Sequence, residues 1–219
     1  MQDPKNKSEE QPSVCLYRKK FMGMGIKLMQ ADLTKHLYYM HFWANHEYAI
    51  QYWQKEGDIK QFFDFYATKL KTNEEIILIA YLDELPIAQI EIFTVLNSAL
   101  KDHIKAGTSD LGMHFIMAPY RDMLKKVGDK TMELSIAVLQ SVLEYLFYNA
   151  RAKNIIVEID NENKNACLLA KHAGFDLLKK IVVPEKAVAL FRYKMPEFLK
   201  KFPRPPKDTG LNLFADKFQ

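Results

Sequence analysis

The chain has 219 residues, of which 48% are hydrophobic and 26% are charged, a composition typical of a globular protein that buries its core without disulfides. The formal net charge is only +4, and basic residues are interspersed with acidic ones, so we expect no nucleic-acid partner. Cys15 and Cys167 lack the spacing of a zinc site, which favours reduced thiols and no bound metal. Without a signal-peptide pattern or a membrane-length apolar run, we expect a cytoplasmic protein with no membrane partner.

The sequence predicts one folded domain, residues 14–195, between two polar ends. Residues 1–13 are rich in Lys, Glu and Gln and cannot bury enough apolar surface to offset the entropy of ordering, so we expect a disordered arm. Residues 196–219 contain the stretch KFPRPPKDTG, which predicts an extended, proline-containing tail.

The first half of the domain predicts helices followed by antiparallel strands. Apolar and aromatic residues at helical spacing favour two short helices in residues 32–55 and a third in residues 58–70. Short apolar runs, the first rich in β-branched residues, predict three strands, at residues 76–82, 87–95 and 111–117.

The second half predicts a crossover between parallel strands. A long apolar helix at residues 131–150 precedes a strand at 155–159 and a helix at 163–172, which ends before Gly174. A strand, a helix and a further strand in this order imply a right-handed crossover and a parallel pair. Two more strands are expected, at residues 177–183 and 187–193. The predicted fold class is therefore α/β, with a mixed, mostly antiparallel sheet flanked by helices.

Three stretches of sequence carry a linked set of motifs. In the first, a strand ending in Glu-aromatic precedes a Gly-x-His-apolar-apolar strand, with the key positions Glu91, Phe93, Gly112 and His114. The second stretch begins with a helix, continues with a strand that ends in an acid, and closes with an Asn-containing helix that ends in Ala-Gly-Phe. Its key positions are Phe147, Glu158, Asp160, Asn163, Ala173, Gly174 and Phe175. The third, FWANHEYAIQYWQKEG, is a pair of helices with Trp and Asn. Over about residues 25–195, this order resembles the GNAT acyltransferases, and the motifs resemble the siderophore-biosynthesis branch that acylates hydroxylysine or hydroxyornithine.

The resemblance implies that acetyl-CoA or another acyl-CoA is the co-substrate, with its pyrophosphate at the loop that enters the long helix. Unpaired N–H groups and the helix dipole stabilise a phosphate at such a helix N-terminus. The expected cofactor-binding residues are Ile116, Lys125, Lys126, Gly128, Lys130, Thr131 and Asn163. The loop departs from the family pattern, because it is longer, starting from Tyr120, with Lys125 in place of the leading residue and Lys130 at the second small position. A solvated loop is the alternative. For Asn163, capping the following helix is an equal alternative.

His114 is the candidate general base. Histidine titrates near neutrality, and strand alternation places Gly112, His114 and Ile116 on one face. A lone histidine in a strand is more often structural, but the matching histidine of the family faces the acceptor. Asp160 ends a strand expected beside that of His114, where its carboxylate would orient the imidazole or hold the acceptor's amino group, and capping the next turn is its alternative.

The resemblance places Trp43, Asn45, Trp53 and Glu91 on the acceptor side, although aromatic residues at this spacing are more often core. Many GNAT enzymes protonate the leaving thiolate with a tyrosine, but Ala170 stands at that position, so the general acid stays unassigned.

The resemblance thus implies a CoA-dependent N-acyltransferase that acetylates the hydroxylamine or amine of a hydroxylysine- or hydroxyornithine-type precursor by direct transfer. One alternative is a GNAT enzyme that acts on an antibiotic amine or a protein N-terminus. Another is a non-catalytic CoA-binding domain, which the irregular phosphate loop and Ala170 would suit. A monomer and a homodimer are equally open.

Overall fold

A computed structural model describes residues 14–72, 75–183 and 186–203 of the protein. The first half contains β1 (Cys15–Phe21), β2 (Met24–Gln30), α1 (Leu33–Ala44), α2 (Glu47–Ile50), α3 (Ile59–Thr72), β3 (Glu75–Leu82), β4 (Leu85–Thr94), the short 3-10 helices η1 (Val95–Asn97) and η2 (Ala99–Asp102), and β5 (Asp110–Met117). The second half contains α4 (Tyr120–Val127), α5 (Thr131–Glu144), the π-helical turn η3 (Tyr145–Asn149), β6 (Asn154–Asp160), α6 (Lys164–Ala173), β7 (Asp176–Val183), β8 (Lys186–Lys194) and α7 (Met195–Lys201).

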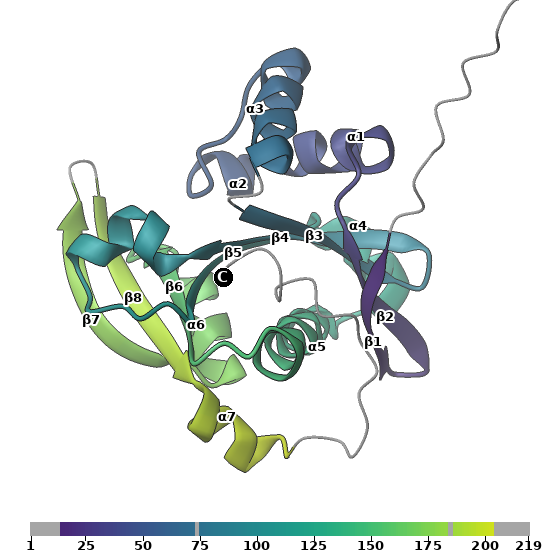
Figure 1. The fold of residues 1–219 in the computed structure, drawn as a ribbon. Helices are drawn as coiled ribbons and strands as arrows, with labels where there is room; N and C mark the ends of the chain where they lie inside the picture. Colours follow the sequence, from purple (N-terminus) through teal and green to yellow (C-terminus); the bar gives the residue numbers. More distant parts are fainter. Residues whose placement is uncertain (1–13, 73–74, 184–185, 204–219) are drawn as a thin grey trace, which may run out of the picture.

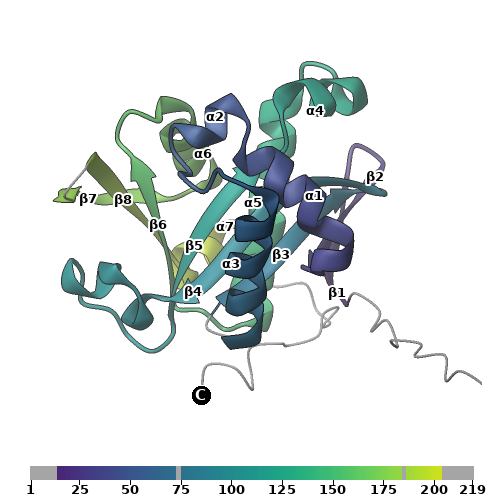
Figure 2. The ribbon, with the colours of Figure 1, turned by 90° about the horizontal axis from the view of Figure 1, so that it is seen from above.

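The strands form one eight-stranded sheet in the order β1-β2-β3-β4-β5-β6-β8-β7. Every neighbouring pair is antiparallel except β5 and β6, which are parallel. Helices α1, α2 and α3 cover one face of the central strands, and α5 lies on the other face (Figures 1 and 2). The predicted fold class, including its single parallel pair, is confirmed.

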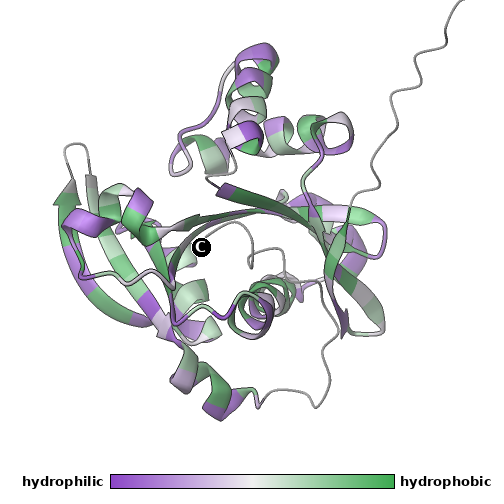
Figure 3. Ribbon diagram, viewed as in Figure 1, coloured by the Kyte–Doolittle hydropathy of each residue, from purple (hydrophilic) through white to green (hydrophobic). Residues whose placement is uncertain are grey.

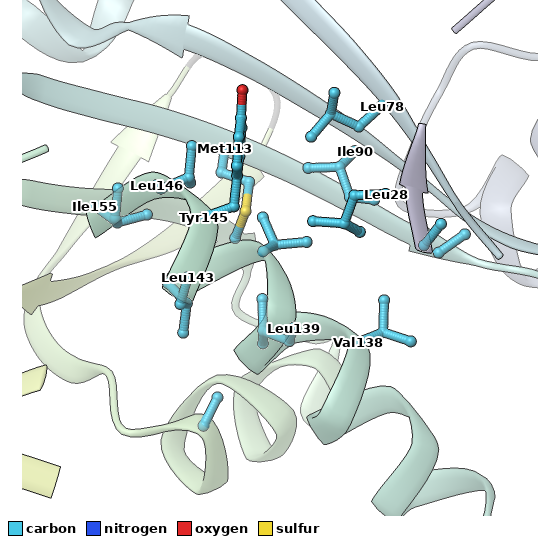
Figure 4. Packing of buried hydrophobic residues seen from close by; sticks show 14 of the residues in the cluster. Leu28, Leu78, Ile90, Met113, Val138, Leu139, Leu143, Tyr145, Leu146 and Ile155 are labelled. Atoms are coloured by element: carbon cyan, nitrogen blue, oxygen red, sulfur yellow. The ribbon is translucent and has the colours of Figure 1, made fainter. Parts of the chain in front are cut away.

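Two layers of apolar side chains hold the helices to the sheet. The larger cluster lies between the sheet and α5, where Leu28, Leu78 and Ile90 pack toward Val138 and Leu139 (Figure 4). The second cluster joins the opposite face of the sheet to α1 and α3. Because β3 and β4 are covered on both sides, they are apolar along most of their length (Figure 3).

Three segments differ from the sequence-based expectations. Residues 15–30 form the hairpin of β1 and β2, which turns at Met22 and Gly23, both with positive φ. The chain after β8 forms α7 instead of continuing as an extended tail, because the side chain of Phe198 is fully buried in the core. Residues 120–127 form α4 where a long loop was expected, and Met123 and Val127, one helical turn apart, are its buried residues. The predicted arm at residues 1–13 and the tail from residue 204 lie outside the described residues.

Candidate active site

A cavity of about 640 Å³ opens where β5 and β6 part. The two strands are paired only as far as Gly112 and Ile156, and beyond this point they line opposite walls of the cavity. Residues from α2 and the loop after it, from α4, and from the first turns of α5 and α6 complete the lining. The volume falls within the range of about 300–1,000 Å³ that is common for small-molecule sites.

Glu91 is a fully buried carboxylate at the centre of a polar cluster beneath this cavity. Its Oε1 accepts hydrogen bonds from the Tyr66 hydroxyl at 2.6 Å and from Nε2 of Gln89 at 3.0 Å. Its Oε2 lies 2.6 Å from Nζ of Lys55 and 3.3 Å from Nδ1 of His114. Both oxygens therefore have partners, as a buried carboxylate requires.

Burial alone would raise the pKa of the Glu91 carboxyl, but its partners outweigh that effect. The hydrogen bond with His114 and the positive charges of Lys55 and Lys69 hold the pKa well below its usual range. Glu91 is therefore ionised at neutral pH. Glu91 was expected to bind the acceptor, but its side chain is inaccessible and contacts His114 instead.

His114 extends from β5 with its side chain 35% exposed and lines the cavity. Its register partner on β4 is Glu91, so strand pairing itself brings the two side chains together. Trp53 packs edge-on against the imidazole at 6.0 Å between ring centroids, and Phe93 packs at 4.9 Å. With Nδ1 directed at the carboxylate, Nε2 is the ring nitrogen left for a ligand.

Gly112 makes room for Phe93 beneath the imidazole. A Cβ atom at this position would lie 2.1 Å from Cε2 of the Phe93 ring, far inside van der Waals contact. The small residue before His114 is thus a packing requirement of the site.

Asp160 and Asn163 both line the cavity, but their contacts are local. Oδ1 of Asp160 accepts a hydrogen bond from the backbone N–H of Glu162 at 2.9 Å, as in the turn-capping alternative. Oδ1 of Asn163 caps α6 by accepting from the N–H of Ala166 at 3.0 Å. The carboxylate that contacts His114 belongs to Glu91 and not to Asp160, because β6 has already diverged from β5 at this level.

The expected phosphate loop is shorter than the sequence suggested. Lys125 and Lys126 lie exposed on the last turn of α4, so only residues 128–130 connect α4 to α5. Gly128 has φ 61° and ψ −136°, a conformation open essentially to glycine alone. Exposed Lys130 occupies the N-cap of α5, whose first residue, Thr131, lines the cavity.

Two of the expected acceptor residues are structural. Trp43 is 2% exposed and belongs to the core beneath α1 and α3, as the alternative interpretation held. Asn45 ends α1 by donating from Nδ2 to the His41 carbonyl, while its Oδ1 accepts from the N–H of Gly57. Neither side chain reaches the cavity, whereas the predicted cofactor residue Ile116 does line it.

Among the residues that face the cavity, Lys55 was not singled out by sequence analysis. Lys55 comes from the loop between α2 and α3, and the order Trp-Gln-Lys at residues 53–55 carries no motif that would identify it. Trp53, which the resemblance places on the acceptor side, does line the cavity. Glu158, a key position of the second sequence motif, lies on β6 two residues before Asp160 and lines the cavity on the same face of the strand. Ala170, which replaces the family's tyrosine, also lines the cavity.

Across the described ranges, no helix has both the length and the apolar character needed to cross a membrane. Within the same residues, no cluster of three or more His, Cys, Asp or Glu side chains is arranged to hold a metal ion.

Comparison with known proteins places this site in a family. Residues 32–183 match the sequence profile described as "Acetyltransferase (GNAT) domain". A protein of Stachybotrys chartarum described as "Putative O-acetyltransferase SAT14" is 24% identical over 174 residues, which cover 78% of this chain and 36% of that protein. The chain therefore spans about a third of the length of that relative.

Several solved structures share the fold. An uncharacterized protein from Bacillus halodurans matches with a TM-score of 0.76 at 17% identity, covering 86% of this chain and 95% of the other. The aminoglycoside acetyltransferase AAC(6')-Ib in complex with coenzyme A matches with a TM-score of 0.68 at 16% identity, covering 80% of this chain and 98% of the other. The spermidine N-acetyltransferase from Vibrio cholerae in complex with CoA and spermine matches with a TM-score of 0.62 at 15% identity, again covering 80% of this chain and 98% of the other. Because the GNAT profile spans well over half of its residues, the protein belongs to the GNAT acetyltransferase family.

Proposed function

We propose that the protein transfers an acyl group, acetyl by default, from acyl-CoA to the hydroxylamine nitrogen of a hydroxylysine- or hydroxyornithine-type precursor. The observation that carries this proposal is the pairing of His114 with the buried, ionised Glu91 at the wall of the cavity. A histidine backed by a carboxylate can accept a proton and is stabilised as imidazolium while it holds that proton. The motifs around Glu91, His114 and Asp160 resemble the siderophore-biosynthesis branch, and they supply the choice of acceptor.

The proposed reaction is a direct transfer. The neutral hydroxylamine nitrogen attacks the thioester carbonyl, and Nε2 of His114 removes the N–H proton as the new C–N bond forms. Collapse of the tetrahedral intermediate breaks the C–S bond and releases CoA, and the proton on His114 leaves to CoA or to solvent. An alkylhydroxylamine is much less basic than an alkylamine, so at neutral pH one histidine gives enough assistance.

The cofactor would follow the parting of β5 and β6. Thr131, the first residue of α5, lines the cavity, and α5 has no side-chain N-cap among the described contacts, so the first N–H groups of this helix suit a phosphate. Lys125, Lys126 and Lys130 are exposed beside this helix end and add positive charge. Asn163 would contact the pantetheine arm through Nδ2, because its Oδ1 caps α6.

Acyl transfer to a different amine is the second candidate. Glu158 and Asp160 put two carboxylates on the β6 wall, where an ammonium group of a polyamine or aminoglycoside would be favoured. The names of the structural neighbours AAC(6')-Ib and spermidine N-acetyltransferase describe such enzymes. A CoA-binding domain without catalysis is a third reading, motivated by Ala170 at the position of the usual tyrosine.

A thiol-release assay with acetyl-CoA separates these candidates. The panel contains N6-hydroxylysine, N5-hydroxyornithine, lysine, ornithine, spermidine and kanamycin. Turnover selective for a hydroxylamine supports the proposal, and selective turnover of spermidine or kanamycin supports the second candidate. Binding of acetyl-CoA in titration calorimetry without turnover of any acceptor supports the non-catalytic reading.

A further inference from the structure

Lys55 is a cation held tightly in the wall of the cavity. Its Nζ lies 2.6 Å from Oε2 of Glu91, 4.9 Å from the centre of the Trp53 ring and 5.7 Å from that of Phe65. The side chain is 22% exposed and lines the cavity. An ammonium group between a carboxylate and two aromatic faces is fixed in place and only partly screened by solvent.

Lys55 and His114 use the same carboxylate oxygen. Nδ1 of His114 lies 3.3 Å from Oε2, farther than Nζ of Lys55. The other oxygen, Oε1, is occupied by two neutral donors, the Tyr66 hydroxyl and the Gln89 amide. The negative charge next to the imidazole is thus already shared with a closer cation.

The remaining charged groups around this cluster are more distant or paired elsewhere. Nζ of Lys69 on α3 lies 3.9 Å from Oε2 of Glu91, but only 2.5 Å from Oε2 of Glu75 on β3. Asp58, on the same loop as Lys55, caps the start of α3 with its carboxylate. Glu158 and Asp160 line the cavity from the opposite strand, β6. Lys55 is the cation that these contacts place closest to the Glu91–His114 pair.

We propose that Lys55 is a positioning residue that competes with His114 for Oε2 of Glu91 and thereby keeps the imidazole unprotonated and ready to act as a base. The role rests on the proposed function, in which His114 removes the acceptor's proton. A full negative charge beside Nδ1 favours the imidazolium, and a second cation on the same oxygen opposes it. Glu91 can then orient the ring through Nδ1 while Lys55 offsets part of its negative charge.

The test compares Lys55→Met, which keeps the stem and removes the charge, with Lys55→Arg, which keeps the charge. Lys69→Met is the matched control, since it removes a lysine at greater distance from Oε2. Nitrogen-15 NMR of histidine-labelled protein follows the titration of His114, whose signal is assigned by its loss in His114→Asn. Lys55→Gln serves as a second uncharged variant if Lys55→Met does not give a folded amide spectrum.

The titration midpoint of His114 is expected to rise by roughly one pH unit in Lys55→Met. The midpoint should stay near the wild-type value in Lys55→Arg, and it should rise less in Lys69→Met than in Lys55→Met. The acidic limb of the pH profile of kcat/KM should shift upward by the same amount as the titration. An unchanged or lower midpoint in the uncharged variants would overturn the role of Lys55.

This experiment also separates the role of Lys55 from the proposed function. A raised midpoint in a protein that acylates no acceptor would support the competition for Oε2 and overturn the reaction. Turnover with an unshifted midpoint would leave the reaction in place and overturn the role of Lys55.

Discussion

Nδ1 of His114 and Oε2 of Glu91 lie 3.3 Å apart on neighbouring strands, where the two residues are direct register partners. Glu91→Gln keeps the shape of the side chain but removes the charge that stabilises the imidazolium. We expect kcat to fall by at least about tenfold, with little change in the KM for acyl-CoA. Steady-state kinetics of the purified variant measure both constants.

Tyr66→Phe is the matched control for Glu91→Gln. It removes a donor to the other oxygen of the same carboxylate and leaves the contact with His114 in place. This variant should lose stability, because Glu91 loses one of its partners, but it should retain kcat within a few-fold. Equal loss of kcat in both variants would show that the cluster acts only through packing.

Gly128 links α4 to the N-terminus of α5 at φ 61°. Gly128→Asp strains this turn and adds a negative charge where we place the phosphates, so the KM for acyl-CoA should rise about tenfold or more while kcat changes little. Gly128→Asn carries a side chain of nearly the same shape without the charge, and its KM should rise less. An unaltered KM for acyl-CoA in Gly128→Asp would contradict the placement of the phosphate site at this loop.

His36 makes stability depend on pH. Its Nδ1 accepts from the N–H of Asp32 at 2.8 Å, so Nε2 carries the proton and donates to the Tyr81 hydroxyl at 2.7 Å. Burial lowers the pKa of His36 in the folded protein. The unfolded chain therefore takes up a proton first as the pH falls, and the stability that neutral His36 provides is lost below about pH 6.5.

Urea unfolding between pH 8 and pH 5 tests this dependence. The free energy of unfolding should decrease below about pH 6.5 in the wild type and decrease less steeply in His36→Gln. His172→Gln, on the exposed end of α6, is the control and should follow the wild type. Parallel curves for all three proteins would contradict the role assigned to His36.

The close approach of Gly112 and Phe93 predicts a packing defect. Gly112→Ala must displace the Phe93 ring, which lies against His114, so we expect a loss of about 1–3 kcal/mol in stability together with reduced kcat. Chemical denaturation and kinetics measure the two effects. Phe93→Leu in the same chain should restore part of the stability, and no recovery would place the clash elsewhere.

The sequence predicted most elements from β3 onward because their patterns are strong. The run IILIAYL is buried on both faces, and Gly174 ends α6 in a left-handed conformation, as its position implied. The hairpin of β1 and β2 was not predicted, because β1 is an edge strand in which Arg18, Lys19 and Lys20 interrupt the apolar pattern. Helix α4 has only two buried residues, Met123 and Val127, which are too few to produce a recognisable helical repeat of apolar residues in the sequence.

The site was harder to predict than the fold. Alternation along β5 placed His114 correctly on a face with Gly112, but it could not show that α3 and the loop before it bury Glu91. The contact between Lys55 and Glu91 joins residues 36 positions apart and depends on how that loop crosses the sheet. Such contacts follow from tertiary packing, which local patterns do not encode.

The most direct test of the central claim is thiol release by the wild type and by His114→Ala with acetyl-CoA and the hydroxylamine acceptors, alongside calorimetric binding of acetyl-CoA to both. His114→Ala should retain the affinity for acetyl-CoA and lose about 10²- to 10⁴-fold in kcat on a hydroxylamine that the wild type turns over. Undiminished turnover in His114→Ala, or a wild type that turns over no hydroxylamine, would contradict it.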